Sequence, residues 1–597
     1  MATSITNSIK TFKGLKNDED IKHVPLDYFY RMKNFNYSDK GLSGIEKIRF
    51  PEQINQIGTD NIDGMFEYRF LSQANVLETI NIGVTNGGIY KDVLTSPVLL
   101  KSGLNTGKVS FVVFNDKLYI ANGKNYINIY NGNKDIVTEM GAPEAEVSNS
   151  VGNLNGAYYY AMTYTTAGGE EVLGSISNTV NPVNNRVNLS LPLGYTGTLS
   201  RSIYRIVAGG TELKFVVTIG DNTTLTYEDN IADGALGSLI PTVNNELPKP
   251  FFLTVANQKI FAAVVVQYPT QVFITDTNID VIDTANSLDV GNYGFDNTPV
   301  KGIGSDFNNV IVGTEKNIFF VNPADNSVVL TRANIGIKNG YTVRQVPATA
   351  GFPGGLMFVS TLNDVRVMSG LQALPVSTSV DNVRTENWAQ NIRGSLENDL
   401  RSNSNLYAEF HNYRYHLLAS PFRYVFDIRN NSWTYFDITT ENYQSQPQVL
   451  SVLNNFLYNG QNDGWIEQED LELTYRGEDV EAYIESPYID VSTQYKFIEK
   501  MTFWFLPSRV TDVDIEVIAD NNDNFKLETS FNFNPTGTFN HLFFDELYFE
   551  ADRRGMDYKV VNINNPARWI KYRLSVTKGG LDFEGFEITV QPLLNKE

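Results

Sequence analysis

The feature that most constrains the fold is a short pattern repeated along the chain: a polar turn followed at once by strand-forming residues. One copy reads Asn454-Asn-Phe-Leu-Tyr458. Turn residues followed by aromatic or β-branched residues are typical of the entry to an antiparallel strand. The pattern therefore predicts an all-β chain. Its copies begin at Asn86, Asn115, Asn257, Glu315, Asn363, Asn412 and Asn454.

The spacing of the copies indicates a particular architecture. From Asn257 onwards they recur every 40 to 60 residues or so, a period that suits the four-stranded blades of a β-propeller. Hairpins expected at 357–368 and 413–437 fit this reading. Between the copies at Asn115 and Asn257 the gap is about three times longer, which indicates an insertion.

The insertion lies between two proline-marked linkers, Gly141-Ala-Pro143 and Leu247-Pro-Lys-Pro250. Its alternating strands predict a small immunoglobulin-like or fibronectin-like sandwich. We therefore divide the chain into an N-terminal arm with strands that complete the first blades, a first propeller part, the inserted sandwich, a second propeller part and a C-terminal β-sandwich. The ranges are 1–60, 61–142, 143–249, 250–470 and 471–597. Helix is expected only at 385–400.

Charge and composition narrow the class of protein. The formal net charge is -21, which repels nucleic acid at long range. The absence of cysteine excludes disulfides and thiolate sites. The first residues lack the apolar core of a signal peptide, and the longest apolar run, at 260–266, is too short to span a membrane. We expect a product made in the cytoplasm that stays there or leaves within a larger particle.

A search for chemistry finds no catalytic, cofactor-binding or metal-binding residues, so an enzyme is not expected. His411 and His416, five positions apart on one expected strand, would point to opposite faces. The segment Asp520-Asn-Asn-Asp-Asn524 lacks the glycine and distant glutamate of a calcium loop. No Gly-x-Ser-x-Gly elbow and no phosphate-binding glycine loop occur. Trp433 and Trp465 could stack on sugars, although packing between blades is favoured.

The order of segments resembles that of the tail nozzle and tail-stabilisation (tail tubular B-like) proteins of short-tailed, podovirus-type bacteriophages. The resemblance covers about residues 60 to 470. It lies in the order of the segments and their general residue pattern, not in a diagnostic catalytic motif. The stretches that carry it are 202–211 (SIYRIVAGGT), 223–229 (TTLTYED), 271–276 (QVFITD), 309–319 (NVIVGTEKNIF), 354–359 (GGLMFV) and 425–433 (VFDIRNNSW).

The resemblance implies a structural role without a cofactor. Subunits, usually six, would form a ring beneath the portal and adaptor, extend the DNA-ejection channel and anchor fibres or spikes. Genomic DNA would pass through without sequence-specific binding, and the protein would reside in the virion tail after assembly in the host cytoplasm. An acidic channel wall fits this role, because each phosphate contact would slow the passage of DNA.

Two alternatives stay open. A carbohydrate-binding or depolymerising propeller, used in host receptor recognition, would carry clustered acids and aromatics on one set of loops. Here the 68 acids are scattered along the chain, and the Asp-box of sialidases is missing. A cellular propeller scaffold is disfavoured by the absence of WD or kelch signatures.

Overall fold

The computed structural model is built almost entirely of antiparallel strands. Within the described residues, the α-helices are α1 (Gly291–Gly294) and α2 (Arg393–Ser402), and the 3-10 turns are η1 (Asp233–Ala235) and η2 (Gly340–Thr342). The all-β prediction is thereby confirmed. The structure describes residues 5–17, 20–37, 45–294, 297–306, 309–331, 334–376, 393–443, 446–491, 496–519, 526–533 and 557–591.

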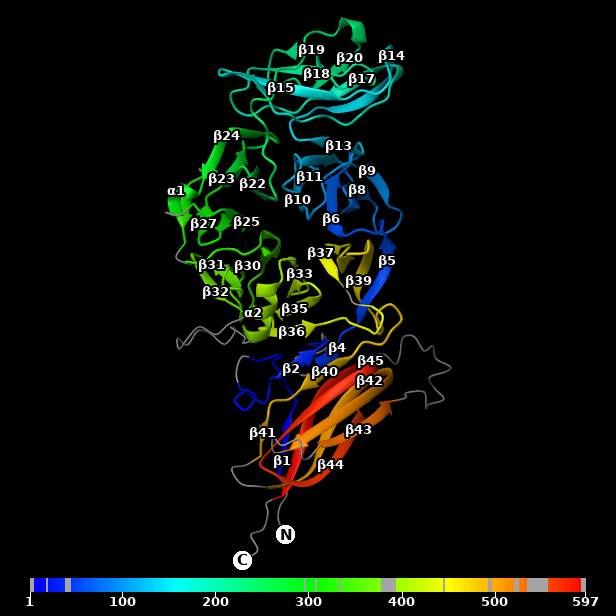
Figure 1. Cartoon of the computed structure of the whole chain (residues 1–597), viewed down its shortest axis with the longest axis vertical. Coiled ribbons are helices and arrows are strands. Elements are labelled where there is room, and N and C mark those ends of the chain that lie inside the picture. The colour runs from blue at the N-terminus through cyan, green and yellow to red at the C-terminus, as the bar shows by residue number, and fades with distance from the viewer. Residues whose placement is uncertain are drawn as a thin grey trace, which may run out of the picture.

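Seven four-stranded sheets occupy the centre of the molecule, and Figure 1 looks down on them as a ring of blades. Blades one to three consist of β6 (Ile62–Leu71), β7 (Leu77–Thr85), β8 (Gly88–Lys91) and β9 (Val98–Lys101); β10 (Ser110–Phe114), β11 (Lys117–Ala121), β12 (Asn128–Asn131) and β13 (Ile136–Glu139); and β21 (Phe252–Ala256), β22 (Lys259–Val265), β23 (Tyr268–Thr275) and β24 (Ile282–Asp289). Blades four to six consist of β25 (Val300–Ser305), β26 (Val310–Thr314), β27 (Ile318–Val321) and β28 (Val328–Leu330); β29 (Arg344–Val346), β30 (Gly355–Val359), β31 (Val365–Ser369) and β32 (Gln372–Pro375); and β33 (Leu406–His411), β34 (Arg414–Ala419), β35 (Phe422–Asp427) and β36 (Ser432–Phe436). The seventh consists of β37 (Pro447–Leu453), β38 (Phe456–Gln461), β39 (Trp465–Glu472) and β5 (Phe50–Gln56).

The first strand of each blade contacts the first strand of the next, from β6 through β10, β21, β25, β29, β33 and β37 back to β6. These strands are therefore the innermost ones, and the ring is closed. A closed ring of four-stranded sheets is a β-propeller.

The seventh blade is completed by a strand from the other end of the chain. Antiparallel pairing places Trp465 of β39 opposite Gln56 of β5, and Gln468 opposite Glu52. The expectation that residues 1–60 complete the first blades is thus wrong. β5 directly precedes blade one, which is the neighbour of blade seven in the ring, so the last blade is the one within its reach.

The repeated turns have a shared backbone conformation. In five hairpins both turn residues have positive φ angles, which is the geometry of a two-residue type I′ turn and a conformation that asparagine tolerates. The repeat does not mark one fixed place in a blade: some copies join the first and second strands, whereas the copy at Asn363 joins the second and third. The five turns are Asn86-Gly87, Asn115-Asp116, Asn257-Gln258, Asn412-Tyr413 and Asn454-Asn455.

The insertion between blades two and three forms two antiparallel sheets, which lie at one end of the molecule in Figure 1. They pack around a shared core that includes Tyr160, Val187 and Ile203 and continues into blades two and three through Tyr119 and Phe273. One sheet contains β14 (Glu144–Asn155), β17 (Val183–Ser190) and β20 (Thr226–Asp229). The other contains β16 (Gly169–Val172), β15 (Tyr160–Thr166), β18 (Ser200–Arg205) and β19 (Lys214–Ile219).

The opposite end of the molecule is a ten-stranded sheet that takes strands from both ends of the chain. Tyr572 and Phe583 are eleven positions apart on β45, so a straight strand would separate them by about 36 Å. Their ring centroids are 6.3 Å apart, so the sheet folds over on itself to enclose a core. Its strands are β1 (Ile5–Ile9), β2 (Arg31–Lys33), β3 (Phe35–Tyr37), β4 (Ile45–Lys47), β40 (Ala482–Glu485), β41 (Ile489–Asp490), β42 (Lys496–Ala519), β43 (Lys526–Phe533), β44 (Asp557–Ala567) and β45 (Trp569–Gln591).

The helix expected at 385–400 lies further along the chain, over Arg393–Ser402, and the positions before it are outside the described residues. Leu396 and Leu400, one helical turn apart, are both buried in the core shared with blades five and six. The one-turn helix α1 was not expected, because its composition, Gly-Asn-Tyr-Gly, carries no helical pattern.

Candidate functional site

The residues considered from sequence do not form a site. His411 and His416 lie on adjacent strands, β33 and β34, so the expectation of one shared strand is wrong; a turn at Asn412 separates them. Trp433 is fully buried and donates its Nε1 hydrogen to the carbonyl oxygen of Val376 at 3.1 Å, which is a packing role. Trp465 is half-buried.

Across the described ranges, acids and histidines do not gather in threes in a way that could hold a metal ion. The 520–524 segment is outside these ranges. Within the same ranges, none of the helices combines the length and apolar character needed to cross a bilayer.

The most unusual group of side chains lies at the mouth of the propeller channel. Asp63, Lys108, Phe252, Tyr341 and Tyr407, here called the axial cluster, sit at or just before the start of the innermost strands of blades one, two, three, five and six. Because each blade starts with its innermost strand, these starts meet at one end of the channel. Side chains from non-adjacent blades can touch only across the central axis of the propeller.

Tyr341 is at the centre of the axial cluster. Its hydroxyl donates to the carbonyl oxygen of Lys108 at 2.7 Å. Its ring meets that of Phe252 edge-on at 4.6 Å and stacks on that of Tyr407 at 5.8 Å. The side chain of Asn339, which caps η2, accepts from the Tyr341 backbone N–H at 2.8 Å and fixes the start of the turn. Tyr341 therefore joins blades two, three and six.

Charged groups surround the aromatic rings. The ammonium of Lys108 lies 5.1 Å from the centre of the Tyr407 ring, and the guanidinium of Arg344 lies at the same distance from that ring. Arg344 pairs with Glu409 at 3.3 Å, and the carboxylate of Asp63 accepts from the backbone of Gly107. Burial raises the pKa of the Asp63 carboxyl. The channel mouth therefore combines opposite charges in a poorly solvated place.

No local sequence pattern indicates the axial cluster. Lys108 and Tyr341 are 233 positions apart, and Lys108 and Leu406 are 298 apart. The local pattern around Lys108 is that of a polar loop before a strand, so only the closure of the ring brings these residues together.

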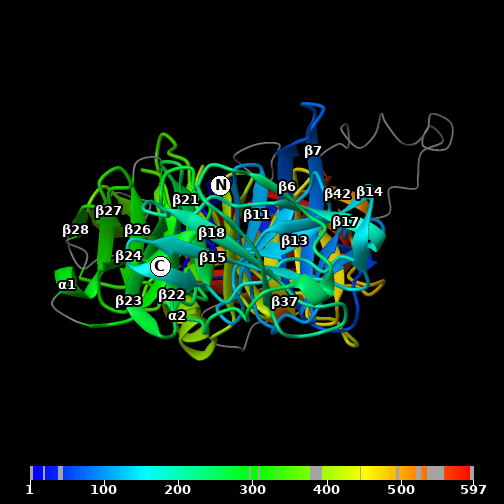
Figure 2. The ribbon, with the colours of Figure 1, turned by 90° about the horizontal axis from the view of Figure 1, so that it is seen from above.

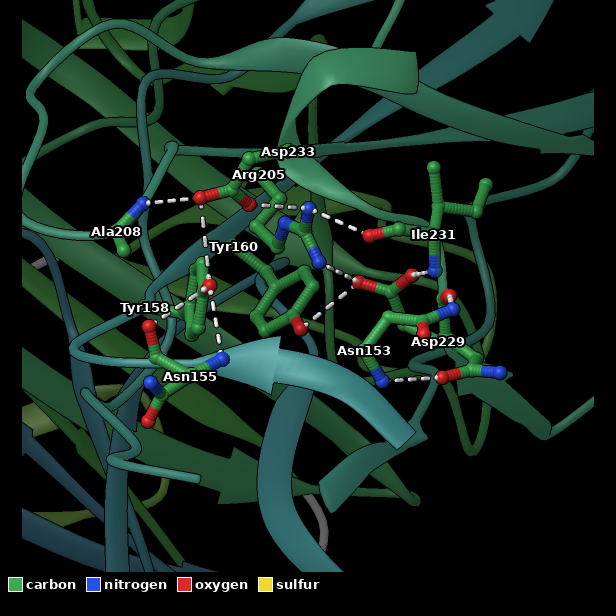
Figure 3. Close-up of polar contacts among 10 residues, drawn as sticks. Asn153, Asn155, Tyr158, Tyr160, Arg205, Ala208, Asp229, Ile231 and Asp233 are labelled. Carbon is green, nitrogen blue, oxygen red and sulfur yellow. Dashed lines mark hydrogen bonds and ion pairs between the residues drawn. The ribbon is translucent and has the colours of Figure 1, made fainter. Parts of the chain in front are cut away.

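A second polar cluster lies inside the inserted module (Figure 3). Arg205 and Asp229 are fully buried and form an ion pair of 2.7 Å. The carboxylate of Asp229 also accepts from the Tyr160 hydroxyl at 3.0 Å and the Ile231 backbone N–H at 2.9 Å. Arg205 makes a second pair with Asp233 at 2.9 Å. Both terminal nitrogens of Arg205 and both carboxylate oxygens of Asp229 have partners inside the module, so the cluster fixes the segment after β20 to β18.

The outer edges of two blades expose apolar side chains. β9 is the outermost strand of blade one, and its Val98 and Leu99 are 46% and 50% exposed. β28 is the outermost strand of blade four, and its Val329 and Leu330 are 50% and 37% exposed. Three blade steps in a ring of seven place these edges about 150° apart. Figure 1 shows blade one and blade four on opposite sides of the ring.

No protein-family model matches the sequence, and no curated protein matches it. Solved structures similar to the chain include BamB from Moraxella catarrhalis, at 11% identity over 62% of this chain and 95% of that one, with a TM-score of 0.26. Virginiamycin B lyase from Staphylococcus aureus matches at 10% identity over 70% of this chain and 98% of that one, with a TM-score of 0.25. The computationally designed Ika8 protein matches at 9% identity over 70% and 100%, with a TM-score of 0.32. The propeller assignment rests on the strand order and not on these similarities.

Proposed function

We propose that this chain is a structural, ring-forming subunit of a short-tailed bacteriophage tail. In this role it is a nozzle or hub that extends the DNA-ejection channel below the portal and adaptor and anchors fibres or spikes. It is not an enzyme. The proposal also includes an immunoglobulin-like identity for the inserted two-sheet module, and residence in the virion tail after assembly in the host cytoplasm.

The observation that carries the ring is the pair of open apolar edges on opposite sides of the propeller. A closed ring needs head-to-tail contacts, in which two different surfaces of each copy meet. β9 and β28 are two such surfaces, and an unpaired edge strand can pair with another chain. Lys91 and Lys101 on β8 and β9 already pair with Asp135 and Glu139, so the contact between the two edges would rest on their apolar side chains rather than on charge.

The channel mouth supports a specific path for DNA. Side chains of five blades meet on the axis of the propeller, so the bore of a single propeller is no conduit. The DNA channel would instead lie between copies, along the axis of the ring. The net charge of -21 suits a wall past which phosphates slide without binding.

The ring is tested by measuring the mass of the full-length chain in solution by mass photometry. We expect closed oligomers of six subunits, the number that the resemblance in sequence implies, and monomers for Leu99→Lys and for Leu330→Lys. Leu225→Lys, at an equally exposed leucine of the inserted module, is the matched control and should leave the oligomer intact. An equal mixture of the two edge variants should give dimers, because one variant retains β28 and the other β9. Failure of the mixture to pair contradicts a head-to-tail contact between these edges.

The tail role is tested separately by quantitative mass spectrometry of purified phage particles. We expect the chain in the particles at one copy for every two portal subunits. Its absence from particles would refute the tail role, whatever the oligomeric state in solution.

A further inference from the structure

Lys108 has surroundings that are unusual for a lysine. Its ammonium group donates one hydrogen bond, to the carbonyl oxygen of Leu406 at 3.2 Å, and lies over the rings of Tyr407 and Tyr341 at 5.1 and 5.6 Å. An ammonium has three N–H donors, so two of them have no acceptor among the described residues. The residue as a whole is half-buried at the channel mouth.

The charged groups that face this amine come from every element packed around it, and each carboxylate has another donor. Asp63 of β6 accepts from the Gly107 backbone, and Glu409 of β33 pairs with Arg344 of β29. Among the described residues, no carboxylate oxygen lies within 4.0 Å of the Lys108 nitrogen. A lysine that is desolvated near another cation is the arrangement that makes an amine nucleophilic.

The charge balance follows from this geometry. Burial lowers the pKa of Lys108 to about 7; the Asp63 carboxylate opposes this shift, and the Arg344 guanidinium adds to it to a smaller extent. At neutral pH about half of the Lys108 side chains would be neutral, compared with about one in 2,500 for an ordinary lysine.

We propose that Lys108 is a reactive amine site at the mouth of the propeller channel, one that takes small aldehydes and activated acyl compounds. With an aldehyde, the nitrogen lone pair attacks the carbonyl carbon, the carbonyl oxygen takes up a proton, and loss of water gives an imine. With an acyl compound, a carbon–nitrogen bond forms, the leaving group departs with its electron pair, and the amine loses a proton. This proposal does not depend on the tail function.

The test is competitive labelling of the full-length chain with propionaldehyde, with cyanoborohydride as the hydride donor that traps the imine. Mass spectrometry then gives a rate for each lysine over a range of pH. A less basic amine is also a weaker nucleophile, which offsets part of the gain in neutral amine. We expect Lys108 to react roughly 30-fold faster than the exposed Lys526 at pH 7, with a rate that reaches half its maximum near pH 7.

Two results would overturn the proposal. One is a half-maximal pH above 9, which would mean a fully charged amine. The other is a rate at pH 7 no higher than that of Lys526, which would mean a shielded amine. Arg344→Gln provides an internal check that leaves Lys108 in place. Loss of the nearby cation frees Glu409, so the half-maximal pH should rise, and circular dichroism of the variant checks that the chain stays folded.

Discussion

The two ion pairs on strand β20 offer a controlled test of what holds the inserted module together. Arg205–Asp229 and Arg186–Glu228 have the same nitrogen–oxygen distance of 2.7 Å. The first pair is fully buried, whereas the side chains of the second are 39% and 40% exposed. The acids are consecutive residues, so their substitution isolates the effect of burial.

Asp229→Ala leaves three donors without their acceptor: the Arg205 Nη1, the Tyr160 hydroxyl and the Ile231 N–H. Removing one partner of a buried pair costs about 3–5 kcal/mol. Glu228→Ala breaks a solvated pair and a long hydrogen bond of 3.4 Å from the Ser148 hydroxyl, and should cost less than about 1 kcal/mol. For a module of this size, the first change lowers the melting temperature by roughly 12–20 °C and the second by less than about 4 °C.

The assay is urea and thermal unfolding of the segment 142–250, followed by circular dichroism. We expect the segment alone to unfold in one cooperative transition. Asp229→Asn, which keeps one acceptor oxygen, should fall between the two alanine variants. Equal losses for Asp229→Ala and Glu228→Ala would refute the argument from burial, and a non-cooperative melt of the parent segment would refute its independence as a folding unit.

Two further predictions concern the propeller. A Cβ on Gly464 would lie 2.4 Å from the carbonyl oxygen of Gly58, just beyond β5, whereas one on Gly370 would meet nothing within 4 Å, although both residues have positive φ. Gly464→Ala should therefore speed hydrogen exchange in 50–58, Gly370→Ala should not, and equal exchange would contradict the clash. Burial, together with Arg423, holds the pKa of His416 well below its ordinary value. Below about pH 6.5 the unfolded chain binds a proton at His416 that the folded chain does not. The free energy of unfolding is therefore at its full value above about pH 6.5 and decreases as pH falls. His416→Phe should make the decline in melting temperature from pH 7.5 to 5.5 shallower, and an unchanged decline would exclude His416 as its cause.

The local features of the fold could be predicted from the sequence because they depend on neighbours in the chain. An Asn-led turn such as Asn454-Asn455 needs only its own backbone preference and the strands on either side. Long-range pairings carry no such signal. β5 has an unremarkable polar sequence, FPEQINQ, and only the geometry of a closing ring decides that it joins the seventh blade.

The same limit explains why the candidate site was missed. Lys108 and Tyr407 have no local signature, and their relation depends on which innermost strands face each other across the axis. The two histidines show a smaller error of the same kind. An expected strand through His411 and His416 ignored the type I′ turn at Asn412-Tyr413, where the repeat itself had marked a hairpin.

The pairing of β5 with β39 also sets a delay during synthesis. The partners Gln56 and Trp465 are about 410 positions apart, and at 5–20 residues per second the ribosome needs roughly 20 to 80 s to make the chain between them. During that interval six blades and the inserted module can form, while the first innermost strand has no neighbour on one side and β5 has no partner. An unfinished propeller is thus exposed to other nascent copies for as long as its closing partner is still inside the ribosome. Crowding of nascent chains on one messenger RNA would therefore favour the exchange of β5 between copies over closure of the ring within a single copy.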